Sequence, residues 1–281
     1  MATVYSALGS EITLAEMLPD LLPGVDKDMT VFLKKRLDKS RVILRLSSQV
    51  AGIEETPQAL KVMWGNKEEQ GSYERYDKVL IAVGRKPNTD NCCLEKARIS
   101  CDDKGFIQVN ANRQTTNARI FAVGDVTGEP LLAHKASHEG RVAAEAVAGK
   151  DSRFEPKAIP AVIFTNPEIA WCGLTETQAK AQGRDIRVAK FPWAASGRAV
   201  TLNRPDGMTK ILIDPSTQRI LGMAIVGVNA GELISEAVVA MKKDALASDL
   251  SSSIHPHPTL SETLMEAAET VCEQGLHIYR P

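Results

Sequence analysis

The sequence predicts an α/β protein in which partial nucleotide-binding domains precede a separate α+β domain. Two apolar stretches, residues 81–83 and 120–123, each run directly into a glycine, Gly84 and Gly124. Open α/β sheets bind nucleotides at the carboxyl ends of buried strands, where a missing side chain lets the ligand approach the backbone. After residue 157 the pattern changes to strands and turns followed by an amphipathic helix, which indicates the second domain.

Length and composition limit the class of protein. The 281 residues suffice for about two domains, and 43% hydrophobic with 25% charged residues is ordinary for a soluble globular chain. A net charge of -1 with interspersed signs argues against nucleic acid or an anionic membrane as the main partner. No apolar run reaches the roughly eighteen residues of a membrane span, and the first residues do not start a signal peptide.

The five cysteines are odd in number and show neither C-x2-C nor C-x4-C spacing. This pattern predicts no disulfide framework and no zinc site, and it favours a reduced, cytoplasmic setting. His134 and His138 lie four residues apart and could share a metal on one helical face, but no third ligand is evident. We therefore expect no metal site.

In the first part of the chain, residues 2–8 are predicted to form a helix that Gly9 ends, and residues 11–15 a strand that ends at Glu16. An acid at a strand end suits the second strand of a dinucleotide-binding unit, where the carboxylate holds ribose hydroxyls. The phosphate loop of such a unit lies about twenty residues earlier, upstream of Met1, and the sequence contains no G-x-G-x-x-G. Glu16 could equally be a solvated strand end.

Hydrophobic periodicity and turn residues predict the remaining elements. Helices are expected at residues 26–37, 132–148 and 232–243, with Gly149 ending the second. Strands are expected at residues 42–44, 60–63, 78–83, 120–123, 209–214 and 220–227. Residues 66–71 suit a charged, hairpin-like turn, and residues 152–157 a linker.

Near the C-terminus, His255 and His257 each precede a proline. Proline restricts both its own φ and the preceding residue, so the ring of His257 is aimed by a stiff backbone, as a general base requires. Glu262 could orient the ring and stabilise its charged form. Alternatively, Thr259 and Glu262 form a capping box at the start of a helix and the histidines are turn residues. A capped helix and an aimed base can coexist, and we expect His255 to be structural.

Several motifs together resemble one family. Residues 82–88 (Ala-Val-Gly-Arg-Lys-Pro-Asn) resemble the A-x-G-R-x-P-N segment of the pyridine nucleotide-disulfide oxidoreductases, and residues 121–135 resemble their second flavin-contacting segment. Residues 191–199 (Phe-Pro-Trp-Ala-Ala-Ser-Gly-Arg-Ala) and 255–262 are similar to the members that oxidise dihydrolipoamide. The resemblance runs essentially end to end and implies FAD and NAD as cofactors.

The resemblance also implies roles for individual residues. His257 would deprotonate a dihydrolipoyl thiol with Glu262 as its partner, and the peptide between residues 257 and 258 would be cis. Asp125 would accept hydrogen bonds from the ribityl chain of FAD, and the backbone at Ala133 would approach the flavin ring. Glu16 would hold the adenine ribose of NAD, and a carboxylate there disfavours NADP. The NAD site would be lined by Val50, Ala82, Val83, Gly84 and Arg85.

On the same resemblance, residues 1–85 are the remainder of an NAD-binding domain, residues 86–152 the C-terminal segment of an FAD-binding domain, and residues 153–281 a dimerisation domain. Members of the family act across a homodimer, so a homodimer is implied, with the lipoyl domain of 2-oxoacid dehydrogenase complexes as a further partner.

The sequence departs from the family pattern because it lacks the FAD glycine loop, the redox C-x4-C pair and the NAD glycine loop. We therefore expect the chain to be the C-terminal part of a longer polypeptide, inactive alone and poorly soluble through an unpaired sheet edge. Two alternatives stay open: another disulfide reductase of the family, such as a glutathione or mercuric reductase, and a non-catalytic dimerisation module.

Overall fold

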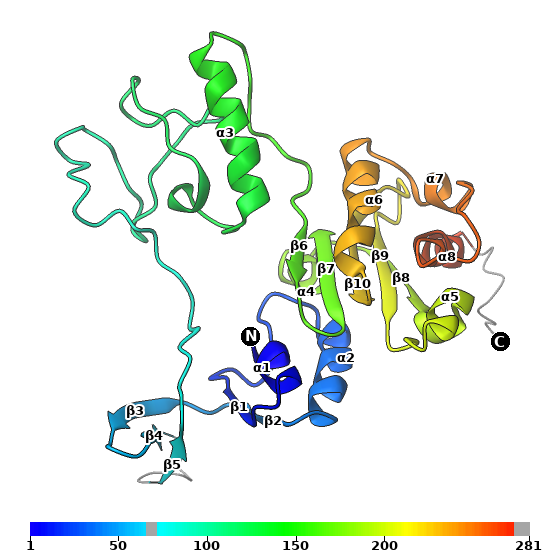
Figure 1. The fold of residues 1–281 in the computed structure, drawn as a ribbon. Helices are drawn as coiled ribbons and strands as arrows, with labels where there is room; N and C mark the ends of the chain where they lie inside the picture. Colours follow the sequence, from blue (N-terminus) through cyan, green and yellow to red (C-terminus); the bar gives the residue numbers. More distant parts are fainter. Residues whose placement is uncertain (66–71, 273–281) are drawn as a thin grey trace. The chain divides into compact units, whose positions relative to one another are not determined.

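The structure is a computed structural model that describes residues 1–65 and 72–272 (Figure 1). The chain forms two compact units. The first comprises Met1–Val79 together with Pro160–Pro281, and the second is Leu80–Ile159. Within the described ranges, no helix has the length and apolarity needed to cross a membrane.

The first unit begins with a β-α-β arrangement. Helix α1 (Ala2–Ala7) precedes strand β1 (Ile12–Ala15), helix α2 (Lys27–Asp38) and strand β2 (Val42–Arg45). β1 and β2 pair in parallel, with Ile12 opposite Val42, because α2 provides the crossover that parallel strands require. The predicted helix and strand at residues 2–15 and the helix that follows are confirmed. Such a unit suits the dinucleotide-binding role expected of Glu16.

Three antiparallel strands follow in the order β3 (Val50–Glu55), β4 (Leu60–Trp64) and β5 (Tyr73–Tyr76). The guanidinium of Arg45 stacks on the Trp64 ring, 4.6 Å from its centroid, and also pairs with Glu74. These contacts connect strands β4 and β5 of the three-stranded sheet to the end of β2. The charged turn predicted at residues 66–71 lies outside the described residues.

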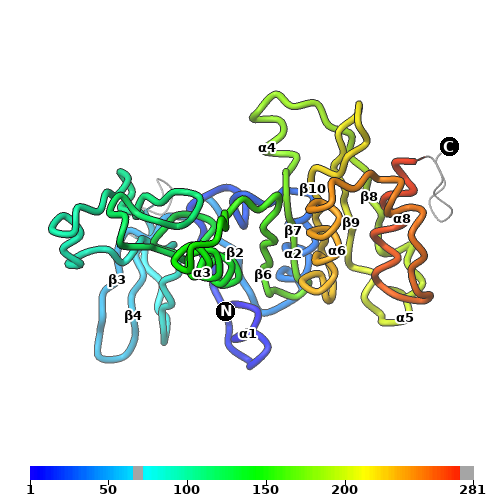
Figure 2. Tube along the Cα trace, turned by 90° about the horizontal axis from the view of Figure 1, so that it is seen from above, coloured from blue at the N-terminus to red at the C-terminus, as the bar shows by residue number. Residues whose placement is uncertain are grey.

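The rest of the first unit is an antiparallel sheet covered by helices (Figure 2). Its strand order is β6 (Ala161–Ile163), β7 (Glu168–Gly173), β10 (Ile220–Gly227), β9 (Met208–Ile213), β8 (Arg187–Pro192). The helices are α4 (Glu176–Ala181), α5 (Gly197–Thr201), α6 (Ala230–Lys242), α7 (Ala247–Ser251) and α8 (Glu262–Val271), with a 3-10 turn η2 (Trp193–Ala195). The predicted α+β composition of this region is confirmed, while its division from the rest of the chain at residue 153 stays a prediction.

The two faces of this sheet pack against different helices. Ile169 and Val226, opposite each other on β7 and β10, join one core with Met29 and Leu33 of α2. Strand side chains alternate between faces, so Cys172, three residues after Ile169, points the other way. There its sulfur lies 3.7 Å from that of Met241 on α6. Residues of α2 therefore share a hydrophobic core with this antiparallel sheet.

The second unit contains the 3-10 turn η1 (Gly124–Thr127), helix α3 (Ala133–Val147) and long connecting segments. The prediction of α3 and of its end at Gly149, which has φ +78°, is confirmed. The predicted strands at residues 78–83 and 120–123 are wrong: the first forms no ladder, and the second contributes one isolated bridge, between Phe121 and Gln114.

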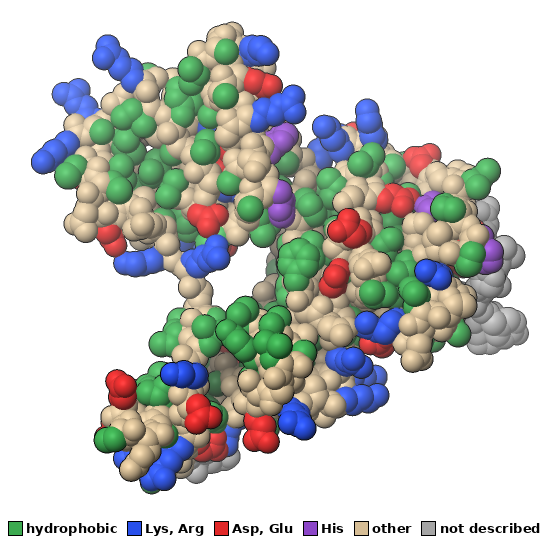
Figure 3. Space-filling model, in the orientation of Figure 1, with side chains coloured by type: hydrophobic (Ala, Val, Ile, Leu, Met, Phe, Trp, Pro, Cys, Tyr) green, Lys and Arg blue, Asp and Glu red, His purple; other side chains and the backbone are tan. Residues whose placement is uncertain are grey.

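The physical reason for this difference is the lack of a neighbouring strand. A strand needs a partner for its backbone N–H and C=O groups, and no described strand pairs with either stretch. The apolar side chains that such a partner would help to bury are exposed instead, 61% for Leu80, 69% for Ile81 and 93% for Val83. Apolar side chains on the surface are visible at several places in Figure 3.

Candidate active site

His257 and Glu262 lie together just before and at the start of α8. Nδ1 of the His257 ring lies 2.9 Å from Oε1 of Glu262, and the His257 side chain is 79% exposed. In the neutral tautomer that donates Nδ1–H to the carboxylate, Nε2 carries the lone pair. Among the described residues Nε2 has no hydrogen-bond partner, so it faces solvent as a proton acceptor. The peptide between His257 and Pro258 is cis, as predicted.

Glu262 also organises the backbone beneath the ring. Its Oε2 accepts the N–H of Thr259 at 2.7 Å. Burial would raise the pKa of Glu262, but the Thr259 N–H and the His257 ring together outweigh burial and hold the pKa below its usual value. Glu262 is therefore ionised at neutral pH and can stabilise an imidazolium.

The capping-box prediction is correct in one half and wrong in the other. Glu262 accepts the backbone N–H of Thr259, as the motif requires. The Thr259 hydroxyl instead donates to the carbonyl of Pro256 at 2.7 Å. The reason is that α8 begins two residues later than the motif suggests, after Ser261, so Thr259 is not the N-cap.

His255 has a different environment. Its Nε2 lies 2.8 Å from Oε1 of Glu236 on α6, and its Nδ1 lies 2.9 Å from the carbonyl oxygen of Ser253. Both ring nitrogens are therefore engaged within the fold, and only 7% of the side chain is exposed. This geometry suits the structural role expected for His255.

A buried chain of hydrogen bonds connects the Phe-Pro-Trp motif to the start of α8. Trp193 Nε1–H donates to the Thr209 hydroxyl at 3.0 Å, which donates to that of Thr263 at 2.8 Å. The Thr263 hydroxyl donates to the carbonyl of Leu260 at 2.7 Å. Trp193 and Thr263 are completely buried, so this chain fixes the turn that carries His257 and Glu262 on the sheet.

Glu16 and Val50 lie in the first unit. Glu16 follows β1, where its backbone N–H donates to the carbonyl of Arg45 at 2.9 Å. One carboxylate oxygen accepts the N–H of Leu18 at 2.9 Å, while the side chain stays partly exposed. A half-exposed carboxylate at the carboxyl end of a parallel strand can accept ribose hydroxyls. Val50, 39% exposed, begins β3.

Ala82, Val83, Gly84 and Arg85 lie in the second unit, so their grouping with Glu16 and Val50 into one NAD site stays a prediction. Gly84 has φ +118° and open space where a Cβ would stand, which fits close approach by a ligand. Arg85 Nη1 lies 3.3 Å from Oδ2 of Asp125. The structure thus brings Arg85 and Asp125, the residues that follow Gly84 and Gly124, together within this unit.

Asp125 and Ala133 stand at the two places expected for the flavin segment. Asp125 belongs to η1, and its carboxylate side chain is 46% exposed. Ala133 is the first residue of α3 and is exposed. An accessible carboxylate accepts hydrogen bonds from hydroxyl groups, so Asp125 suits the hydroxyl-rich ribityl chain of FAD. Contact with a flavin stays a prediction for both residues.

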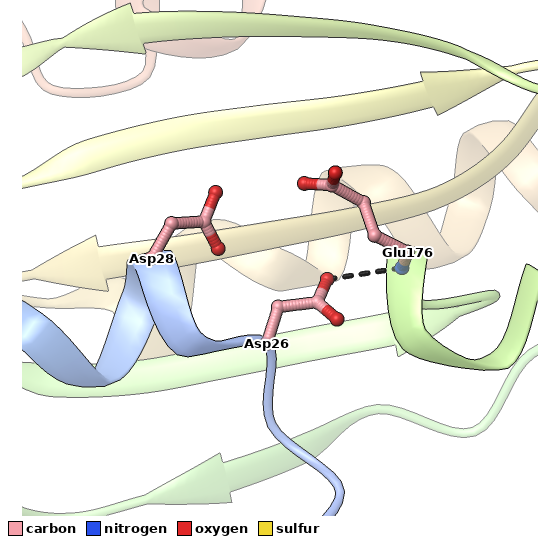
Figure 4. Close-up of side chains that lie close together, drawn as sticks. All are labelled: Asp26, Asp28 and Glu176. Atoms are coloured by element: carbon pink, nitrogen blue, oxygen red, sulfur yellow. Dashed lines mark hydrogen bonds between the residues drawn. The ribbon is translucent and has the colours of Figure 1, made fainter. Parts of the chain in front are cut away.

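An acidic cluster that sequence reasoning missed lies where α2, α4 and β9 meet. The carboxylates of Asp26, Asp28 and Glu176 converge, and Asp26 accepts the backbone N–H of Glu176 at 3.0 Å (Figure 4). The cluster centre is occupied by the ammonium of Lys210, at 2.7 Å from Asp26 and 2.8 Å from each of the others. Lys190 lies 2.7 Å from Asp28 and 3.3 Å from Glu176, so lysines supply the cations that the three carboxylates require.

The cysteines show no sign of a redox pair. All five are free; Cys92, Cys93 and Cys101 are exposed, while Cys172 is buried. Burial raises the pKa of Cys172 to about 12, which makes its thiolate rare at neutral pH. Of the two histidines that lie four residues apart on α3, His138 packs its ring against Phe154, with 5.7 Å between the ring centroids.

Two family models match the chain. The model described as "Pyridine nucleotide-disulphide oxidoreductase" covers residues 1–140, and the one described as "Pyridine nucleotide-disulphide oxidoreductase, dimerisation domain" covers residues 159–268. The chain belongs to the pyridine nucleotide-disulphide oxidoreductase family, whose members use FAD and a pyridine nucleotide.

Within that family the chain is similar to curated proteins named dihydrolipoyl dehydrogenase. The protein from Vibrio cholerae is 46% identical over 269 residues, which cover 96% of this chain and 56% of the relative. The protein from Thermus scotoductus is also 46% identical, over 99% of this chain and 60% of the relative. The chain thus spans little more than half the length of these relatives.

Solved structures agree on the fold. The HOCl-induced flavoprotein disulfide reductase RclA from Escherichia coli matches with a TM-score of 0.87 and 29% identity, over 96% of this chain and 61% of that one. LpdA from Mycobacterium tuberculosis matches with a TM-score of 0.87 and 26% identity, over 96% of this chain and 58% of that one.

Proposed function

We propose that this chain supplies the thiol base, the dimerisation region and part of each cofactor site of a dihydrolipoyl dehydrogenase. The observation that carries the proposal is the His257–Glu262 pair, which presents an exposed Nε2, without a hydrogen-bond partner among the described residues, on the surface of the dimerisation region (residues 159–268). The overall reaction would oxidise protein-bound dihydrolipoamide with NAD as acceptor, serving 2-oxoacid dehydrogenase complexes. The 46% identity to curated dihydrolipoyl dehydrogenases supports this substrate class.

The chemistry of the base follows from its geometry. Nε2 of His257 accepts the proton of a dihydrolipoyl thiol, and the resulting thiolate is the nucleophile that attacks a disulfide. The carboxylate of Glu262 holds the ring through Nδ1 and stabilises the imidazolium that forms. Bound FAD would supply the two-electron relay to NAD, with Asp125 and Ala133 at the flavin and Glu16 at the adenine ribose.

The proposed partners are a second copy of the chain and a lipoyl domain. The dimerisation-domain match supports a homodimer. A base that is 79% exposed suits a substrate thiol carried by another polypeptide, since the dithiol must reach it from outside. The free, exposed thiols of Cys92, Cys93 and Cys101 suit a reduced, cytoplasmic setting.

The 281-residue polypeptide prepared alone should not turn over dihydrolipoamide, since its sequence holds no C-x4-C pair to exchange with the substrate. A chimera tests the proposal. The N-terminal segment of the Vibrio cholerae relative that precedes the match would be joined to residues 1–281, and NAD reduction by dihydrolipoamide measured.

We expect NADH production by the chimera, its loss in His257→Gln, and none from residues 1–281 alone. A chimera that reduces glutathione disulfide but ignores dihydrolipoamide would instead support another disulfide reductase. A dimer that retains FAD and turns over neither substrate would support a non-catalytic dimerisation module.

A further inference from the structure

The backbone that carries Asp125 is held by a carboxylate that is completely buried. Glu139, on the second turn of α3, is 0% exposed. Its Oε2 accepts the backbone N–H of Gly124 at 2.6 Å and lies 3.1 Å from the Thr127 hydroxyl. That hydroxyl also lies 2.8 Å from the carbonyl oxygen of Gly124. The residues on both sides of Asp125 are therefore tied to α3.

Two cations complete the arrangement. Lys135, four residues before Glu139, is 5% exposed and lies 3.2 Å from Oε1 of Glu139. Its ammonium also donates to the carbonyls of Gly124 at 3.2 Å and Gly128 at 2.9 Å. Arg113 donates to Oε1 of Glu139 at 3.0 Å. The two oxygens of Glu139 thus serve different groups, one the backbone of η1 and the other the two cations.

The Asp125 carboxylate is not a member of this network. Gly124 is buried with φ +85°, a conformation that side chains rarely adopt, while the Asp125 carboxylate is 46% exposed. Lys135 and Glu139 bind the backbone of η1, and in the described part of the chain their hydrogen bonds and ion pairs do not include the Asp125 carboxylate. Their effect on any ligand of Asp125 must therefore act through the position of this turn.

We propose that Glu139 is a positioning residue for FAD: it fixes η1 so that Asp125 presents its carboxylate to the ribityl hydroxyls. This inference rests on the proposed function, because it assumes that Asp125 binds the flavin. An amide cannot replace the carboxylate. Glutamine has one acceptor oxygen, so its NH2 group would face either the Gly124 N–H or the two cations. Donor would then face donor in a buried site.

The first experiment uses residues 1–281 without cofactor. Backbone amide exchange at Gly124 would be compared in the unaltered chain, Glu139→Gln, and the control Glu145→Gln, whose carboxylate lies on the same helix and contacts Arg141 and Ser152. We expect Gly124 to exchange about tenfold faster in Glu139→Gln. An unchanged Gly124 rate in Glu139→Gln would overturn the inference.

The second experiment measures FAD dissociation from the chimera described above. We expect the Kd for FAD to rise about tenfold to a hundredfold in Glu139→Gln and to stay unchanged in Glu145→Gln. Excess FAD should restore turnover in Glu139→Gln, with the KM for NAD unaltered. A general loss of folding would not be reversed by excess FAD. An unchanged FAD Kd in a chimera that binds FAD would overturn the inference.

If Glu139→Gln does not fold, the variant Glu139→Asp, which has a shorter carboxylate side chain, can replace it in the exchange experiment. Glu139→Asp keeps the negative charge for Arg113 and Lys135 but cannot reach Gly124, so faster Gly124 exchange is expected there too. If the unaltered chimera binds no FAD, the proposed function fails while the Gly124 exchange rate still decides whether Glu139 fixes η1. The two failures are therefore distinguishable.

Discussion

Nδ1 of His257 and Oε1 of Glu262 lie 2.9 Å apart, and the second oxygen of the same carboxylate binds the backbone N–H of Thr259. One carboxylate therefore fixes both the imidazole ring and the turn that carries it. The pair is built within six residues of chain, but the turn is held in place by α8 and the buried hydroxyl chain beneath it.

Replacing Glu262 with glutamine in the chimera should lower kcat for dihydrolipoamide oxidation by about tenfold to a hundredfold, less than the roughly 10²- to 10⁴-fold expected for His257→Gln. The amide can still contact the ring but cannot stabilise an imidazolium. The matched control, His255→Gln, should keep most of the turnover, because His255 contacts Glu236 rather than the exposed site. Equal losses in the two histidine variants would contradict these roles.

Lys210→Met should lower the free energy of unfolding by about 3–5 kcal/mol at pH 7, because it leaves the buried carboxylate of Asp26 without its cation, while Asp28 and Glu176 keep Lys190. Burial would lower the pKa of Lys210, but Asp26, Asp28 and Glu176 outweigh burial and raise it. Urea unfolding of residues 1–281 measures the difference. Lys180→Met, an exposed change on α4, is the control and should stay within about 0.5 kcal/mol. Equal stability of the two variants would contradict the role of Lys210.

The same cluster predicts a pH dependence. Burial would raise the pKa values of Asp26 and Asp28, but their hydrogen bonds, chiefly from Lys210 and Lys190, lower them below the usual 3.8. Their stabilisation is complete above that value and is lost as pH falls through the folded-state pKa values. The raised pKa of Lys210 makes its contribution complete below 10.5 and lost at higher pH. Urea unfolding should therefore show Lys210→Met approaching the unaltered chain as the pH falls through the folded-state pKa values of these two carboxylates.

Glu16→Gln in the chimera should raise the KM for NAD about tenfold, since a charged hydrogen bond to the ribose would be lost. The preference for NAD over NADP should also narrow, because repulsion of a 2′-phosphate disappears. Glu11→Gln, an exposed change just before β1, provides the control. Steady-state kinetics would give the KM values for NAD and NADP in both variants. Equal KM values for Glu16→Gln and Glu11→Gln would contradict the assignment of Glu16 to the ribose of NAD.

Thiol labelling should separate the cysteines by burial. The thiolate is the reactive form, and burial raises the pKa of Cys172 to about 12. Iodoacetamide at pH 8 should therefore modify Cys92, Cys93 and Cys101 in the folded chain and reach Cys172 only in urea. Peptide mass spectrometry would read the result. Labelling of Cys172 at the same rate as Cys101 without denaturant would refute its burial.

Local signals in the sequence predicted most elements correctly. The helix before Gly149 and the strands at residues 209–214 and 220–227 follow from periodicity and turn residues, which act within a few positions. The strands expected at residues 78–83 and 120–123 did not form, because an apolar run becomes a strand only beside a partner. Pairing is a property of the fold, and an isolated stretch cannot reveal it.

The cluster around Lys210 could not be predicted from the sequence. Lys210 and Asp26 are 184 residues apart, and neither stands in a recognisable motif. Lys135 and Glu139 do stand at helical i,i+4 spacing, a signal that allows a salt bridge but gives no hint of burial or of the bond to Gly124.

The sequence by itself determined the family motifs and the chemical identity of the base, since proline restraint and a carboxylate five residues away act over short range. Only the tertiary structure decided that the His257 ring is exposed, with no partner for Nε2 within residues 1–65 and 72–272, while His255 is engaged by Glu236. It also decided that Glu139 and Lys210 are buried among partners distant in sequence. Exposure and ion pairing depend on which elements pack together, and packing is settled by the whole chain.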